Sequence, residues 1–185
     1  WMRFYGLLFG VVSKADSLFA EVDSCYNQLR KRASLSSSSL SIVSELKSGS
    51  AWYVPGGCST IGRLFNDACG RYAFAEDKHS GSIPLAFETV FDKAGDADVW
   101  TIKYNRDRDM TYSDLKADYI GYTGFKAFKT RNIYGCNTAK VPFYEETPFR
   151  PDYLLSDLIQ ILHPEIGAVS YTNLRAHETR SNLVC

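Results

Sequence analysis

The sequence lacks several features that would point directly to a function class. It has no apolar run of about 18 residues, so no membrane-spanning helix is expected. Its 21 Lys and Arg residues balance its 21 Asp and Glu residues, whereas a general nucleic-acid binder would carry a clear excess of cations. Hydrophobic residues make up 45% and charged residues 23% of the 185-residue chain, which excludes wholesale disorder. One ordinary domain, or one domain with an appendage, is expected.

Metal-binding and disulfide patterns are missing as well. The five cysteines, an odd number, show no Cys-x-x-Cys spacing, and none of the three histidines has a spacing typical of a zinc site. Cys58 and Cys69 flank a predicted helix that separates them by about 15 Å, which is too far for a disulfide. We therefore expect thiols that are buried or half-buried, and no resident metal.

Helical periodicity is the clearest structural signal in the chain. Apolar residues recur at spacings of three and four in four segments. Ser59 is the expected N-cap of the second segment, and Gly70 its end. Pro84 is expected to open the third segment, and Gly95 to end it. The four predicted helices span residues 14–32, 60–69, 86–94 and 151–162.

Short strands are predicted between these helices. A serine-rich loop at residues 34–41 precedes the first strand, and Thr111 with Asp114 predicts a capping box at the start of a short helix. Gly135 is expected to close the last strand. The alternation of strands and helices predicts an α/β fold, a mostly parallel sheet flanked by helices. The predicted strands span residues 41–46, 51–54, 72–74, 99–102 and 131–134.

The most informative local motif is the turn Gly56-Gly57-Cys58-Ser59, which lies between a predicted strand and a predicted helix. The backbone N–H groups of such a turn can bind an anion or a polar ligand. The turn lacks the lysine of a P-loop and the third glycine of a dinucleotide fingerprint, so neither site is supported. A tight turn without a ligand remains open as the alternative.

An enzymatic interpretation also remains open. Cys58 could act as a thiol nucleophile with His79 or His163 as its base, although no local signature supports this pairing. His79 lies in a polar stretch that is more typical of a solvated loop. A run of tyrosines could stack on a flat ligand or be scattered between core and surface. These are Tyr104, Tyr112, Tyr119 and Tyr122.

Four segments together resemble the C-terminal lobe of a periplasmic substrate-binding protein. They read WYVPGG at residues 52–57, HSGSIPLAFETVFDKAGDADVW at 79–100, GFKAFKTRNIYGCNT at 124–138 and PDYLLSDLIQILHPE at 151–165. The family is the iron-complex and vitamin B12 type that serves ABC importers, in a form similar to that of Bacteroidetes-like bacteria. The resemblance covers about residues 1–166.

The resemblance implies a domain organisation. In this family two α/β lobes are joined by a long helix, and the ligand lies in the cleft between them. Residues 1–33 would be the end of the inter-lobe helical region and residues 34–166 the C-terminal lobe. The apolar start of the chain predicts that a further segment precedes it, and the resemblance implies that this segment holds an N-terminal lobe and a leader. Residues 167–185 are expected to be a poorly ordered tail outside the family, and an artefactual origin is one interpretation, because residues 170–180 resemble a translated adapter peptide.

The resemblance also implies a ligand and a location. The ligand would be a ferric siderophore, haem or a corrinoid, the protein would need no cofactor of its own, and it would be periplasmic, anchored as a lipoprotein. Loops at the strand ends would form the ligand face, in line with the position of ligands beyond the carboxyl ends of parallel strands. The ligand-binding residues would be Trp52, Gly56, Gly57, Ser59, Lys103, Tyr104 and Asn105.

One further role follows from the resemblance. Each lobe of the family presents a glutamate near a helix start to arginines of the importer's permease. Glu88 matches this position, although Ala86 stands where the pattern has serine. A carboxylate that only complements the helix dipole is the alternative.

Three functions are therefore compared. The resemblance implies a binding protein of an ABC importer without enzyme activity. A thiol-dependent hydrolase that uses Cys58 is the second hypothesis, and a sensory binding domain that does not transport is the third.

Overall fold

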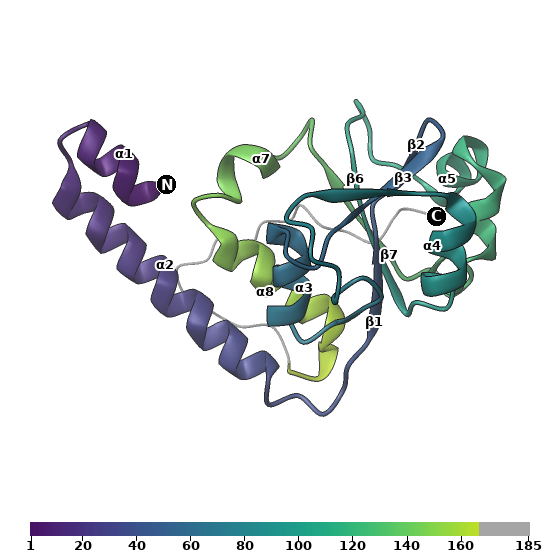
Figure 1. Ribbon diagram of the computed structural model, residues 1–185, viewed down its shortest axis with the longest axis horizontal. Helices are drawn as coiled ribbons and strands as arrows, with labels where there is room; N and C mark the ends of the chain where they lie inside the picture. Colours follow the sequence, from purple (N-terminus) through teal and green to yellow (C-terminus); the bar gives the residue numbers. More distant parts are fainter. Residues whose placement is uncertain (167–185) are drawn as a thin grey trace.

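The structure is a computed structural model that describes residues 1–166 (Figure 1). The tail predicted from residue 167 onward lies outside the described residues. A helical hairpin of α1 (Met2–Leu8) and α2 (Val12–Ala33) leads into an α/β lobe. The helix predicted over residues 14–32 is confirmed as α2. None of the helices in residues 1–166 is long and apolar enough to cross a membrane.

A four-stranded sheet forms the centre of the lobe. Its strands are β4 (Arg71–Tyr72), β1 (Ser41–Ser44), β6 (Val99–Tyr104) and β7 (Ile133–Asn137), in that order, and all neighbours run parallel. The predicted α/β fold with a mostly parallel sheet is confirmed. Gly135 does not close the last strand as predicted, because it pairs with Ile102 and β7 continues to Asn137.

A second, antiparallel sheet corrects two predictions. Its order is β2 (Lys47–Ser48), β3 (Ala51–Pro55) and β5 (Ser82–Leu85), so the strand predicted at residues 51–54 lies outside the parallel sheet. Pro84 does not open a helix: it pairs with Tyr53 in β5. Since β5 is an edge strand of this sheet, a residue without an N–H group is tolerated there.

The helices agree with the predicted ranges to within two residues. The capping box of Thr111 and Asp114 is present at the start of α5. The left-handed residue after α3 is Cys69, with φ 55°, rather than Gly70. The described helices after α2 are α3 (Thr60–Asp67), α4 (Phe87–Ala94), α5 (Tyr112–Asp118), α6 (Lys126–Lys129), α7 (Phe143–Glu146) and α8 (Pro151–Leu162), with the 3-10 turns η1 (Ile120–Gly124) and η2 (Pro164–Ile166).

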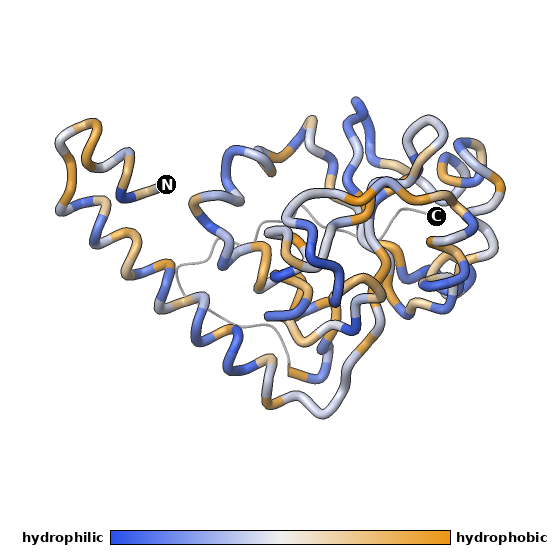
Figure 2. The backbone as a smooth tube through the Cα atoms, in the orientation of Figure 1, coloured by the Kyte–Doolittle hydropathy of each residue, from blue (hydrophilic) through white to orange (hydrophobic). Residues whose placement is uncertain are grey.

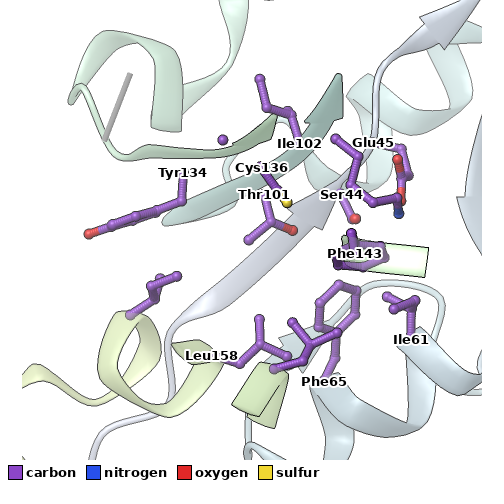
Figure 3. A pocket seen from close by; sticks show the side chains of 14 residues that line it. Ser44, Glu45, Ile61, Phe65, Thr101, Ile102, Tyr134, Cys136, Phe143 and Leu158 are labelled. Atoms are coloured by element: carbon purple, nitrogen blue, oxygen red, sulfur yellow. The ribbon is translucent and has the colours of Figure 1, made fainter. Parts of the chain in front are cut away.

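Different side chains pack against the two faces of the parallel sheet. On one face Trp100 of β6 packs on Trp52 of β3, with ring centroids 5.6 Å apart, and on Phe125 at 4.9 Å. The next residue along β6, Thr101, faces α3 and α8 instead, because side chains alternate along a strand (Figure 3). Aromatic rings therefore fill one face of the sheet, whereas α3 and α8 cover the other.

The long helix α2 connects the hairpin to the lobe. Its C-terminal half packs on α8 and buries Leu29 and Ala33. The Tyr26 hydroxyl donates to Asp67, which ends α3, at 2.7 Å. The N-terminal half and α1 extend away from the lobe and carry exposed apolar side chains (Figures 1 and 2). The division into residues 1–33 and 34–166 stays a prediction.

Candidate functional site

The carboxyl edge of the parallel sheet is where the loops after β1, β6 and β7 meet. Glu45 follows β1, Asn105 follows β6, and Thr138 follows β7. The N-terminal end of α3 lies at the same edge, since Ile61 and Lys103 line one cavity. Ligands of open α/β sheets bind beyond this edge. The candidate site is therefore built from these three loops and the start of α3.

Glu45 is the residue with unusual backbone geometry at this edge. Its φ of 69° lies in the left-handed region, which is costly for a residue with a side chain. Its N–H donates to the carbonyl of Thr101 at 2.9 Å, and its carbonyl accepts from Trp100 Nε1 at 2.8 Å. Backbone strain of this kind collects at functional sites. Sequence reasoning missed Glu45, whose only signal was a carboxylate directly after a buried strand.

Lys103 forms an ion pair with Glu45. Both side chains are mostly buried, 21% exposed for Lys103 and 18% for Glu45. The Lys103 ammonium also lies 5.4 Å from the ring centroid of Phe143 in α7, a cation–π contact. A charged pair is thus held at the carboxyl edge, next to an aromatic ring.

Asn137 fixes the loop after β6. It is buried, and its Nδ2 donates to the carbonyl of Arg106 at 2.8 Å while its Oδ1 accepts from the N–H of Arg106 and of Ala139, each at 3.2 Å. Tyr104 is half-buried, desolvation raises its pKa, and its hydroxyl accepts from the N–H of Met110. Asn105 is exposed and donates to Thr138 at 3.2 Å. Of the two predicted ligand residues in this loop, Asn105 is the more accessible.

The cations of this loop are already paired with α5. The Arg108 guanidinium donates two hydrogen bonds to Asp114, at 2.7 and 2.8 Å. These bonds, with those from Thr111, hold the pKa of Asp114 well below its usual value. Arg106 pairs with Asp118 at 2.6 Å. These ion pairs hold the loop against α5, and the aspartates of α5 neutralise the two arginines.

The glycine turn before α3 has a clear packing role. The Ser59 hydroxyl accepts from the N–H of Gly62 at 3.0 Å, which confirms Ser59 as the N-cap, and donates to the carbonyl of Gly56 at 2.6 Å. A Cβ atom at Gly56 would lie 2.3 Å from the carbonyl oxygen of His79, and one at Gly57 would lie 2.0 Å from that of Ala75. Because neither glycine carries a Cβ atom, the backbone after β4 can pass close to this turn. A ligand role for Gly56, Gly57 and Ser59 stays a prediction.

Trp52 requires a correction. Its side chain is 0% exposed and lies in the aromatic core, where Nε1 donates to the carbonyl of Ser44 at 2.9 Å. The family resemblance placed Trp52 on the ligand face, with the loop that follows its strand. The tertiary fold turns the indole into the aromatic core, so the Trp52 side chain is not accessible to a ligand.

A small cavity of about 50 Å³ lies beneath the carboxyl edge (Figure 3). The sheet supplies Thr101, Tyr134 and Cys136, and Phe143 of α7 closes the side beside the Glu45–Lys103 pair. Apolar side chains of α3 and α8 complete the lining: Ile61, Phe65, Leu154, Leu158 and Ile161. Sequence reasoning missed this cavity, since its wall is assembled from six separate segments.

The residues of the hydrolase hypothesis do not assemble. Cys58 precedes α3, whereas His163 is buried beyond its other end, with Nε2 2.7 Å from the carbonyl of Ala68. Ten residues of helix and flanking turn keep Cys58 and Ala68 about 15 Å apart. His79 is exposed and pairs with Asp77 at 2.9 Å. Within residues 1–166, no hydrogen bond joins Cys58 to either histidine, and no three His, Cys, Asp or Glu side chains form a group that could hold a metal ion.

The chain belongs to the periplasmic binding protein family, whose model matches residues 1–139. This confirms the family resemblance. Haem-bound IsdE of S. aureus has the same fold, with a TM-score of 0.67 and 17% identity over 88% of this chain and 62% of that one. An Fe³⁺-hydroxamate transport protein of Saccharomonospora viridis has a TM-score of 0.66 and 19% identity, over 90% of this chain and 54% of the other.

A curated relative adds sequence similarity. An uncharacterized lipoprotein of Methanocaldococcus jannaschii is 26% identical over 167 residues, which are 89% of this chain and 38% of the relative. The chain therefore spans well under two thirds of the length of this relative, and also less than two thirds of the two structures above.

Proposed function

We propose that the protein is the substrate-binding component of an ABC importer, which captures a metal complex and delivers it to the permease. The observation that carries this proposal is the carboxyl edge, where three loops, a charged pair and an apolar cavity converge in a chain of the periplasmic binding protein family. The ligand would be a ferric siderophore, haem or a corrinoid. Relatives named for haem and Fe³⁺-hydroxamate support this range.

The proposed ligand contacts are Gly56, Gly57, Ser59, Tyr104 and Asn105 from the sequence prediction, together with Lys103. We propose no enzyme activity and no resident cofactor, because the site offers hydrogen-bond groups and an apolar wall rather than an assembled nucleophile and base. A periplasmic location with a lipid anchor accords with the family and with the relative named as a lipoprotein.

Ligand binding tests the first part of this proposal. The protein encoded by the complete reading frame is titrated with haem, a ferric trihydroxamate and cyanocobalamin, and binding is followed by calorimetry. We expect saturable binding of one class. The 185-residue chain alone should bind more weakly if the ligand lies between two lobes, because a cleft buries it on both sides. Failure to bind any of the three would contradict the proposal.

Substitution of Glu88 tests whether the protein docks on the permease through this carboxylate. It is the second residue of α4 and is exposed, so it can reach a partner without disturbing the core. A charge-assisted contact with a permease arginine would be lost in Glu88→Gln, which keeps the size of the side chain. Asp92→Asn, on the same helix and also exposed, is the matched control.

We expect Glu88→Gln to lower uptake of the bound complex in cells while leaving ligand affinity and stability unchanged, and Asp92→Asn to change none of them. The loss should deepen when a corresponding glutamate elsewhere in the full protein is also replaced. Lost ligand binding in Glu88→Gln would show that this residue belongs to the ligand site instead. Normal uptake in Glu88→Gln, also when the corresponding glutamate is replaced, would show that the docking role of Glu88 is wrong.

A further inference from the structure

The segment between β7 and α8, residues 138–150, starts at the carboxyl edge of the sheet and reaches the helical hairpin of α1 and α2 (Figure 1). We call this segment the strap. It contains α7, and none of the four α7 residues is buried. Because the strap has so little core of its own, the contacts at its two ends decide where it lies.

The first anchor of the strap is Phe143, at the carboxyl edge. Its half-buried ring lies in the wall of the apolar cavity, and the Lys103 ammonium lies 5.4 Å from the ring centroid (Figure 3). The cavity of about 50 Å³ lies on one side of the ring. Dispersion holds a ring beside such a space less firmly than a close-packed core residue, so the Phe143 ring has room to shift.

The second anchor lies at the other end of the strap and holds the hairpin. The Phe149 ring centroid is 5.9 Å from that of Tyr5 in α1. The Arg150 guanidinium donates to Asp152 at 3.0 and 2.7 Å and lies 3.9 Å from the carboxylate of Glu21 in α2. Since Asp152 is fully buried at the start of α8, this end of the strap joins both helices of the hairpin to the lobe.

Backbone hydrogen bonds connect the two anchors. The N–H of Thr147 donates to the carbonyl of Phe143 at 3.1 Å. The carbonyl of Glu146 then accepts from the N–H groups of Phe149 and Arg150, at 2.9 and 2.8 Å. The chain between the anchors is therefore a short hydrogen-bonded unit, and a displacement of one anchor is passed to the other.

We propose that the strap couples the carboxyl edge of the sheet to the orientation of the helical hairpin. A shift of the Phe143 ring moves α7, and the hydrogen-bonded unit carries this movement to the contact of Phe149 with Tyr5. For its trigger the proposal rests on the proposed function, since a ligand at the carboxyl edge would contact the loops beside Phe143. The coupling itself is a property of the chain without ligand.

Hydrogen–deuterium exchange tests the coupling in the protein encoded by the complete reading frame. Amides of α1, of the strap and of β6 are followed separately by mass spectrometry. Phe143→Ala removes the first anchor, and Tyr144→Ala, at the exposed neighbouring position in α7, is the matched control. Phe149→Ala removes the contact with Tyr5. A double variant combines Phe143→Ala with Phe149→Ala.

We expect Phe149→Ala to speed exchange in α1 about fivefold and Phe143→Ala about threefold, in keeping with the contribution of one aromatic pair. The double variant should exchange like Phe149→Ala, because the edge then has lost its route to α1. Tyr144→Ala should match the wild type, and β6 should stay protected in every variant. If β6 also exchanges faster in Phe143→Ala, Phe143→Leu, which keeps an apolar anchor, replaces it in both the single and the double variant.

Three results would overturn the coupling. The first is faster exchange that stays within the strap when Phe143 is replaced. The second is an equal effect of Tyr144→Ala on α1. The third is a double variant whose effect on α1 is the product of the two single effects, since independent anchors would behave in that way.

Ligand probes separate this proposal from the proposed function. Haem, a ferric trihydroxamate and cyanocobalamin are added in turn to the wild type and to Phe149→Ala. A probe that binds should slow exchange in α1 more in the wild type than in Phe149→Ala. Equal slowing in both proteins would overturn the trigger and leave the proposed function standing. Absence of binding for all three probes would contradict the proposed function and remove the trigger, whereas the variants without ligand decide the coupling by themselves.

Discussion

The two ends of strands β1 and β6 carry one ion-paired carboxylate each, and the two are held very differently. At the amino end, Asp98 accepts from the N–H and hydroxyl of Ser41, at 2.8 and 2.7 Å, and from Lys126 at 2.6 Å. At the carboxyl end, within residues 1–166, the charged partner of Glu45 is Lys103. The backbone around Asp98 is ordinary, whereas Glu45 is left-handed.

This difference separates a carboxylate that several donors hold from one that is paired with a flexible lysine. Three donors satisfy both oxygens of Asp98 and join β1 to the start of β6 and to α6, so a ligand has nothing to replace. The Glu45 carboxylate is instead paired with Lys103, whose ammonium stands at the end of a flexible stem beside the cavity.

The largest effect is expected from Asp98→Ala. It leaves the Ser41 N–H without its acceptor and removes the Lys126 contact, so we expect the free energy of unfolding to fall by about 2 kcal/mol. Urea denaturation measures it. Asp96→Ala, at an exposed neighbouring position, should change stability little. Equal effects of the two substitutions would mean that the Asp98 bonds do not stabilise the sheet.

The pH dependence of stability sharpens the same comparison. Desolvation opposes ionisation of Asp98, but the hydrogen bonds from Lys126 and Ser41 outweigh it and lower its pKa from 3.8 to about 2. Because the folded pKa is depressed, the stabilisation is present above about pH 4 and is lost as the pH falls toward 2. The stability difference between wild type and Asp98→Asn should therefore shrink over this window. Urea titrations at several pH values measure it, and a constant difference would contradict the assignment.

A smaller effect is expected from the strained backbone of Glu45. Glu45→Gly and Glu45→Ala both remove the carboxylate, but only glycine adopts φ 69° without steric cost. Glu45→Gly should be more stable than Glu45→Ala by about 1 kcal/mol in urea denaturation. At Lys47, in strand β2, the order should reverse, since glycine weakens a strand. The same order at both positions would exclude backbone strain at Glu45.

The smallest effect on stability is expected from the ion pair of Glu45 with Lys103. Lys103→Met should change the free energy of unfolding by less than about 1 kcal/mol, because methionine keeps an apolar side chain of similar length and a single partly exposed pair contributes little. Thermal and urea denaturation would show it. A loss as large as that of Asp98→Ala would place Lys103 among the structural residues and remove the contrast between the two ends.

Local patterns predicted the helices well because their causes lie within a few residues. Ser59 caps α3 and Thr111 with Asp114 caps α5, as side chains reaching the nearest free N–H groups. Pro84 was misassigned because its place in β5 depends on Tyr53, which lies 31 positions away in the chain. Strand pairing of this kind leaves no local signal. The same holds for Trp52, which the family resemblance placed on the ligand face and which packs on Trp100 in the core.

The sequence by itself determined the alternation of strands and helices, the caps, the family and therefore the edge of the sheet at which a ligand is expected. Periodicity and short motifs encode these properties, because each arises from neighbours along the chain. Only the tertiary structure decided that Trp52 is buried, that Glu45 is left-handed, and that Lys103 pairs with it above a cavity. Those properties depend on contacts between β1, β6, β7, α3, α7 and α8, and distant segments meet only once the sheet has formed.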